Sequence, residues 1–358
     1  MDSFARKPAE ERRVFINEAA SRRDVSAIII EKDFWVCWTL KRLTEHADLA
    51  PHLTFKGGTS LSKAYGIIER FSEDIDLTIG RDAPCVRDAT SPMEAGISKN
   101  EVGRRAEALK LAAQAYVRDV ALPAITGVIA AALGTLQGWR VVLDGEDPDA
   151  QTILFYYPKV LNYSGKSASL NSMGFNSTPF NYYESASYVR PNIKLEFGAR
   201  GENNPHELRS LTPYLAQTFP DALPESELQF TTLAAERTFW EKATILHSLH
   251  HGVRLRDRMS RHYYDTYMLA QKGVAKSALR APVILENVVR NKSLLWRDAK
   301  ASYDTAKIGS LKLVPNDEVL SDLKKDYAAM TDMFMGAAPE FDVVIRGLLE
   351  LEGIINRS

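Results

Sequence analysis

Hydrophobic and polar positions divide the chain into a part with strands and helices and a part with helices alone. Short alternating or apolar runs predict strands at 53–56, 75–79, 138–144, 152–157 and 188–200. Longer periodic runs predict helices at 9–23, 27–43, 60–68 and 101–132, the last broken near Pro123. From Leu233 onward the helical period dominates, at 233–250, 262–272, 276–292 and 318–354. We therefore predict an α/β (α+β) fold, with an α/β core at 1–230 and a helical domain at 231–358 that contributes to the active site.

Three stretches rich in polar residues, glycine or proline interrupt this pattern. The ranges 81–100, 162–187 and 201–225 are predicted as loops, the last with a short element at 211–217. The long loop at 162–187 is typical of a segment that is mobile or functional.

A glycine-rich turn leads into the short helix predicted after residue 56. Gly57, Gly58, Thr59 and Ser60 can place backbone N–H groups and a hydroxyl on phosphates at a helix N-terminus. The turn is not a Walker P-loop, because no Gly-Lys-Ser/Thr follows at the required spacing. Taken alone, it is better explained as a tight turn with Thr59 or Ser60 capping the helix.

Two aspartates follow on the next predicted strand. Asp74 and Asp76 are two residues apart, so both side chains point to one face of a strand. Paired carboxylates suit Mg²⁺, or Mn²⁺, bound to a nucleoside triphosphate. A glycine turn, a helix and two acids within about twenty residues favour a metal-dependent nucleotidyltransferase over a solvated strand face.

Partners for this site have to come from elsewhere in the chain. Glu196 alternates with apolar residues on a later strand and could be a third carboxylate, or an exposed charge beside Lys194. Lys242 lies on an amphipathic helix and could neutralise triphosphate charge, or be an ordinary surface lysine. Asp265 begins a helix and could either favour the helix dipole or face the site.

The most basic stretch lies just before Asp265. Four arginines, Arg254, Arg256, Arg258 and Arg261, occur within eight residues and are followed by two tyrosines. This composition suits contact with an RNA backbone, although a solvated loop would look the same.

Bulk composition limits the possible partners and location. The formal net charge is −1, so a nucleic-acid partner requires a local basic patch. The two cysteines have no spacing typical of a metal or redox site, and no apolar run approaches a membrane span. We expect a cytoplasmic protein that has no membrane partner.

Several motifs, in order, resemble the AbiEii/AbiGii-type nucleotidyltransferase toxins, a group related to the MenT toxins. The resemblance covers roughly 27–272 and does not extend to 81–187 or 273–358. It rests on Glu-Lys-Asp-Phe-Trp at 31–35, Lys-Gly-Gly-Thr-Ser-Leu-Ser-Lys at 56–63, Arg-Phe-Ser-Glu-Asp-Ile-Asp-Leu at 70–77, Lys-Leu-Glu-Phe-Gly-Ala-Arg at 194–200, Glu-Arg-Thr-Phe-Trp-Glu-Lys at 236–242 and Arg-His-Tyr-Tyr-Asp at 261–265.

The resemblance implies a polymerase-β-like core with a mixed sheet and a helical C-terminal part. It implies a toxin of a toxin–antitoxin or phage-defence system that has a cognate antitoxin. Some members transfer a nucleotide to the 3′ end of tRNA, which is the acceptor we expect. By position it matches Gly58 and Ser60 to the phosphate-binding turn, Asp74 and Asp76 to the metal ligands, and Lys242 and Asp265 to residues needed for activity. Glu196 matches a third acid less closely.

Two other functions fit the same residues. The acceptor could be a protein side chain or a small molecule, or the chain could be an NTP-binding regulator without turnover. Ser60, Ser62 and Ser72 lie near the predicted site, and the sequence does not tell whether any of them is modified.

Overall fold

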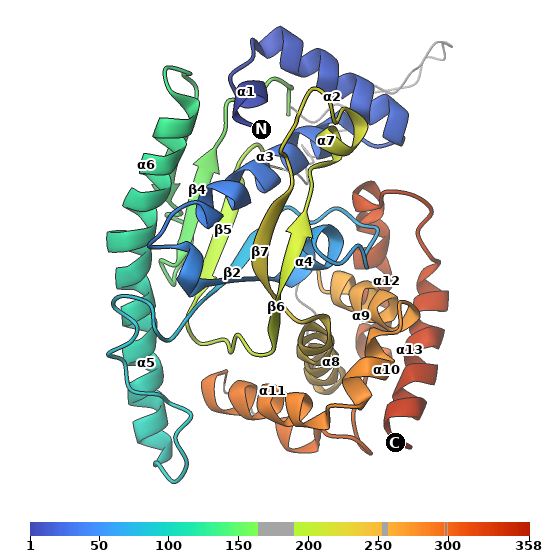
Figure 1. Cartoon of the computed structure of the whole chain (residues 1–358). Helices are drawn as coiled ribbons and strands as arrows, with labels where there is room; N and C mark the ends of the chain where they lie inside the picture. The colour runs from blue at the N-terminus through green and yellow to red at the C-terminus, as the bar shows by residue number, and fades with distance from the viewer. Residues whose placement is uncertain (164–189, 253–256, 297, 299) are drawn as a thin grey trace, which may run out of the picture.

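The computed structural model describes residues 1–163, 190–252, 257–296, 298 and 300–358 (Figure 1). The predicted loop at 162–187 therefore falls almost entirely outside the described residues. Arg254 and Arg256 also lie outside the described residues.

A seven-stranded mixed sheet forms the N-terminal half (Figure 1). In spatial order its strands are β3 (Arg140–Leu143), β4 (Thr152–Tyr156), β5 (Ile193–Gly198), β2 (Ile75–Ile79), β1 (Leu53–Lys56), β7 (Leu228–Leu233) and β6 (His206–Leu211). The pairs β2/β5 and β1/β7 are parallel, and the other neighbours are antiparallel. The predicted α/β class with a mixed sheet is confirmed.

Seven α-helices accompany the sheet within the described N-terminal residues. They are α1 (Asp2–Ala5), α2 (Ala9–Arg23), α3 (Ala27–Thr44), α4 (Gly57–Lys63), α5 (Lys99–Tyr116), α6 (Leu122–Leu133) and α7 (Tyr214–Thr218). The hydroxyl of Ser26 accepts a hydrogen bond from the N–H of Ile28 and caps α3. Trp35 and Trp38 of α3 are fully buried and pack on Phe155, because α3 is apolar on nearly every side.

Several predicted boundaries are wrong for local reasons. The predicted break near Pro123 is absent, because a π-helical turn at Val117–Ala121 joins α5 to α6 and places the proline in the first turn of α6. The helix predicted at 60–68 begins at Gly57 and ends at Lys63. The range 201–225, predicted as a loop, contains β6, whose outward side chains hide the strand pattern.

The continuous helix Lys99–Leu133 is the one described segment that by length and composition could cross a membrane. It does not stand apart from the fold, because α6 packs on β3, α3 and α1. Such a helix is weak evidence for a membrane span, since core helices pass the same test.

The C-terminal half is helical in the described residues. Its α-helices are α8 (Ala235–His251), α9 (Ser260–Gln271), α10 (Val274–Leu279), α11 (Pro282–Leu295), α12 (Asp317–Ala329) and α13 (Phe341–Ile355). The helical pattern predicted at 318–354 is thus two helices, α12 and α13. The apolar faces of helices α8 to α13 form a second hydrophobic core, separate from the core under the sheet. The boundary at 230/231 stays a prediction, and β7 runs across it.

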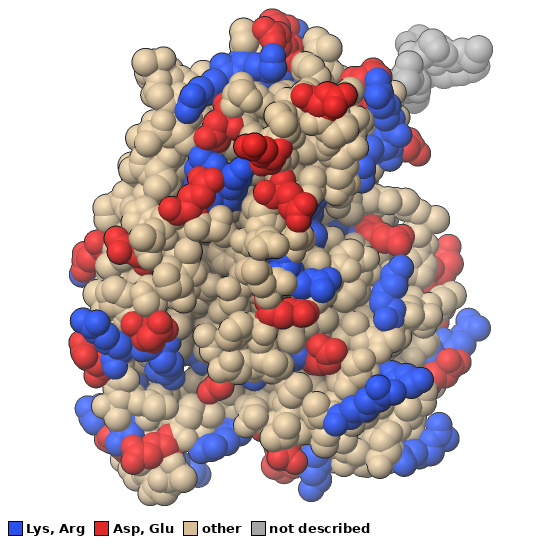
Figure 2. Space-filling model, viewed as in Figure 1, with Lys and Arg blue, Asp and Glu red and all other residues tan. Residues whose placement is uncertain are grey.

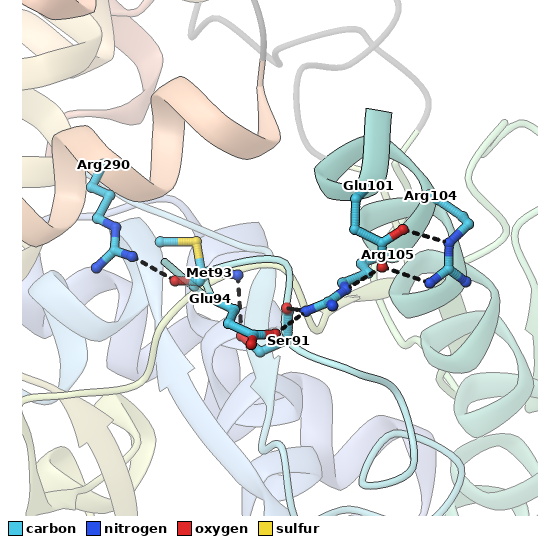
Figure 3. A network of polar contacts seen from close by, with 7 residues as sticks. All are labelled: Ser91, Met93, Glu94, Glu101, Arg104, Arg105 and Arg290. Carbon is cyan, nitrogen blue, oxygen red and sulfur yellow. Dashed lines mark hydrogen bonds and ion pairs between the residues drawn. The ribbon is translucent and has the colours of Figure 1, made fainter. Parts of the chain in front are cut away.

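Contacts between residues distant in sequence fix the two halves to each other. Arg290 of α11 donates to the carbonyl of Met93 at 2.5 Å, and Arg105 of α5 binds the same loop through the carbonyl of Ser91 (Figure 3). The N–H of Phe71, in the loop before β2, donates to the carbonyl of Met333 at 2.7 Å. The helical half therefore braces the loops that lead into and out of the predicted site.

Candidate active site

A row of charged side chains crosses the centre of the sheet. In the ladder, Asp76 of β2 lies opposite Lys56 of β1 on one side and Glu196 of β5 on the other. Residues paired in this way point to the same face of a sheet. Asp74 lies two residues before Asp76 and shares its face. The structure thus brings together the three predicted carboxylates, one of them from more than a hundred residues away.

These carboxylates lack full compensation. Burial raises the pKa of Asp76 to about 7, and Glu196 and Asp74 add repulsion. Burial and Glu196 likewise raise the pKa of Asp74. Glu196 is partly exposed and pairs with Lys194. Because an ionised group at Asp76 costs free energy here, a ligand carrying positive charge would be stabilised.

Three oxygen-donor carboxylates on one face are the ligand type that Mg²⁺ and Mn²⁺ prefer. Within the described ranges, no group of three or more acidic, histidine or cysteine side chains is already gathered as a metal site. Carboxylates on one face of a strand suit a divalent ion whose other oxygen ligands come from a bound triphosphate.

The glycine turn lies directly against the carboxylate row. Gly57 has φ +80, and a Cβ there would lie 1.9 Å from Oδ2 of Asp76. A Cβ on Gly58 would lie 2.6 Å from Oγ of Ser72 and 2.9 Å from the Arg70 guanidinium. Only glycine allows the backbone to approach this closely.

The hydroxyls of the turn are used to hold its shape. Thr59 donates to the carbonyl of Asp74 and to Oγ of Ser72, which ties the turn to the strand that carries the acids. Ser60 is buried and donates to the carbonyl of Gly57 at 2.9 Å. The two hydroxyls that could have capped the helix or bound a ligand are thus committed to the local backbone.

A buried ion-pair network lies behind the turn. Nε and one Nη of Arg70 each donate to a different oxygen of Asp265 at 2.7 Å. Nζ of Lys242 donates to Asp265 at 2.8 Å. The two cations hold the pKa of Asp265 well below its usual range despite its burial, whereas burial lowers the pKa of Lys242. Helices α8 and α9 and the loop before β2 thus meet at one carboxylate.

The basic stretch is only partly described. The side chain of Arg258 lines the cleft over the carboxylate row, and its N–H donates to Asp326 of α12. Arg261 lies close enough to lower the pKa values of Asp74, Asp76 and Lys242, and its Nε has no hydrogen-bond partner among the described residues. An RNA-binding role for these arginines stays a prediction.

The model of the family described as nucleotidyl transferase AbiEii toxin, type IV toxin–antitoxin system, matches residues 38–346. The chain belongs to this family. It is therefore a nucleotidyltransferase, as the motifs predicted. A search of curated proteins gave no match.

Among solved structures, the AbiEii-family chain is similar to MenT4, a nucleotidyltransferase toxin from Mycobacterium tuberculosis. The two chains are 15% identical, with a TM-score of 0.42, and the alignment covers 96% of this chain and 98% of MenT4.

Sequence reasoning missed three basic residues of this AbiEii-family site. Arg70 is the bidentate partner of Asp265, Lys56 stands beside Asp76 in the ladder, and buried Lys32 of α3 binds Glu73. A signal existed for Lys32, because it lies between Glu31 and Asp33 in a helix whose other residues at 27–40 are mostly apolar, and a buried lysine needs a partner. Lys32 and Lys56 line a cleft of about 640 Å³ together with Asp74 and Glu196.

Proposed function

We propose that this AbiEii-family enzyme transfers a nucleotide from an NTP to an RNA hydroxyl, with the 3′ end of tRNA as the acceptor. The observation that carries the proposal is the register of β2 and β5. It sets Glu196 beside Asp76, with the glycine turn against the same carboxylate. Acids for a metal, a backbone turn for phosphates and a further carboxylate for a proton meet at one place.

Asp74 and Asp76 would hold Mg²⁺ or Mn²⁺, which when bound neutralises phosphate charge. The turn Gly57–Ser60 would contact the triphosphate through its backbone N–H groups, since the hydroxyls of Thr59 and Ser60 serve the turn itself. Lys242 would add positive charge beside the phosphates.

In the reaction, the acceptor oxygen forms a bond to the α-phosphorus as the bond to the pyrophosphate oxygen breaks. Glu196 is partly exposed at the edge of the cleft, which suits a group that takes the proton of the attacking hydroxyl. Asp265 is fully buried and already binds two cations. We assign it as a positioning residue for Lys242 and Arg70.

Selection of the acceptor would depend on the basic stretch before α9. Arg254, Arg256, Arg258 and Arg261 are the proposed RNA contacts. Figure 2 shows acidic and basic side chains interspersed over the face in view, in keeping with a net charge of −1. A role in phage defence, a cognate antitoxin partner and a cytoplasmic location belong to the same proposal.

The test is incubation with each α-labelled NTP and total tRNA, with and without Mg²⁺. We expect label in tRNA from one or more NTPs, and none from Asp76→Asn. If label never enters RNA, protein and small-molecule acceptors are assayed next, and label there would replace the RNA proposal. Tight NTP binding without pyrophosphate release would support a regulator without turnover.

A further inference from the structure

A second cleft, of about 1200 Å³, lies between α8 and α11. It shares Lys56, Gly201 and Trp296 with the cleft over the carboxylates, so the two are continuous. Its lining includes Lys292 of α11 and Arg237 and Glu241 of α8. No motif from the sequence falls on α11, so none of the roles given so far involves this helix.

Three lysines lie near the junction of the two clefts. Lys56 and Lys292 line the second cleft, and Lys242 is near enough to act on the pKa of Lys292. Nζ of Lys292 donates to the backbone carbonyl of Glu241 at 2.8 Å. Lys56 stands next to Asp76 in the sheet, and its Nζ would lie 3.6 Å from a Cβ on Gly201. The three lysines come from β1, α8 and α11.

Lys242 is paired with Asp265, so the charges open to a ligand are those of Lys56 and Lys292. Among the residues that the structure describes, no ion pair joins either of these two lysines to an acid, and the Glu241 carboxylate binds Arg237 at 3.2 Å. Burial lowers the pKa of Lys292 to about 7; Glu241 opposes this shift, whereas Lys242 and Lys56 add repulsion. An anion with several charges would relieve this repulsion.

The position of Lys292 is fixed by its neighbours on α11. Arg290 binds the carbonyl of Met93 (Figure 3), and Nδ2 of the buried Asn291 donates to the carbonyl of Arg200 at 3.1 Å. Consecutive residues thus anchor α11 to the loop before α5, to the end of β5 and to α8. A helix held by these separate contacts preorganises the Lys292 ammonium for a ligand.

We propose that Lys56 and Lys292, next to Lys242, bind an oligophosphate anion at the junction of the two clefts. The inference rests on the proposed function, because the ligand would be the triphosphate tail of the NTP or the pyrophosphate that leaves. An RNA backbone fits less well, since the cleft lined by Lys56 and Lys292 continues into the cleft over Asp74 and Glu196, where the triphosphate is expected.

The primary experiment measures binding of inorganic tripolyphosphate by calorimetry to the full chain. We expect Lys292→Met to weaken binding by about 10-fold or more, since hydrogen bonds to charged groups are of that order. Lys292→Arg should bind within about threefold of the unchanged chain, because it keeps the charge. The matched control is Lys276→Met, which removes an exposed lysine of α10 and should change nothing. Unchanged tripolyphosphate binding in Lys292→Met would overturn the inference.

Three further arms identify the ligand. If Lys292→Met weakens binding of a non-hydrolysable NTP analogue as much as it weakens binding of tripolyphosphate, the ligand is the triphosphate tail. If the variant weakens binding of pyrophosphate but not of the analogue, the ligand is the leaving group. Loss of affinity for a short single-stranded RNA, with tripolyphosphate binding intact, would overturn the inference in favour of an RNA contact.

Chemical labelling of lysines tests the same inference on the unchanged chain, so it does not require that a variant folds. Tripolyphosphate should protect Lys292, and not Lys276, from an amine-acylating reagent, as read by mass spectrometry. Equal labelling with and without tripolyphosphate would contradict the proposal.

Nucleotide transfer is assayed separately. A chain that transfers label but fails these tests loses only this inference, and a chain that passes them without transferring label loses only the proposed function.

Discussion

Asp76 and Asp265 lie on opposite sides of the same glycine turn, and their surroundings shift the two pKa values in opposite directions. Asp265 is completely buried, yet Arg70 and Lys242 keep its pKa low. Asp76 is not completely buried, but burial and two neighbouring acids raise its pKa. A compensated buried charge is part of the structure, whereas an uncompensated one indicates a place for a ligand.

The largest effect is expected from Asp265→Asn. Removing this charge leaves Arg70 and Lys242 buried without their acid, which costs about 3–5 kcal/mol in the free energy of unfolding. Nucleotide transfer should fall as well, because both cations lose their orientation. Chemical denaturation measures the first effect. Asp342→Asn, which breaks an exposed pair with Lys324, is the control and should be close to neutral. If Asp265→Asn and Asp342→Asn are equally stable, Arg70 and Lys242 do not depend on the Asp265 charge as described.

Asp76→Asn should reduce nucleotide transfer without reducing the free energy of unfolding. Loss of a metal ligand is expected to reduce transfer by about 10³-fold, comparable to removal of a major electrostatic contact in other enzymes. The free energy of unfolding should stay the same or rise, since the change removes repulsion with Glu196 and Asp74. Thermal melting without metal, together with the label-transfer assay, separates the two effects. A strong loss of stability would contradict the contrast with Asp265.

Glu196→Gln should have a smaller effect on transfer. If Glu196 takes the proton of the acceptor, the rate should fall by about 10²-fold with little change in NTP binding. Lys194→Met is the matched variant, because it removes the partner of Glu196 without touching the carboxylate. If both variants reduce the rate equally, the ion pair itself is what matters, and the proton role fails.

The most gradual effect is the pH dependence of stability without metal. The pKa of Asp265 is lower when folded, so its contribution is present above about 4 and is lost as the pH falls below that value. The pKa of Asp76 is higher when folded, so stability should decline as the pH rises from about 4 to about 7, by at most about 1.4 kcal/mol per pH unit.

Denaturation curves at pH 3 to 8 test both halves of this prediction. Asp76→Asn should flatten the decline toward neutral pH and leave the loss at acid pH unchanged. Adding Mg²⁺ should stabilise the unchanged chain more at pH 8 than at pH 5, because protons no longer compete for the carboxylates. If stability still declines toward neutral pH in Asp76→Asn, another group causes the decline.

The sequence determined the elements whose signals are local. The spacing of Asp74 and Asp76, the glycines before them and the cap at Ser26 depend on neighbours only a few residues away, so pattern and chemistry suffice. The exposed strand β6 and the π-helical passage at Pro123 were missed because tertiary packing overrides local propensity there.

Tertiary structure decided which distant charges meet. The parallel register alone sets Glu196 beside Asp76. The packing of α8 on α9 brings Lys242 to Asp265, and the packing of the loop before β2 on α9 brings Arg70 to it. The same holds for Lys292, which no local pattern distinguishes from a surface lysine until α11 is anchored against α8. Whether a charge is compensated depends on groups far away in the chain, and that information exists only once the chain is folded.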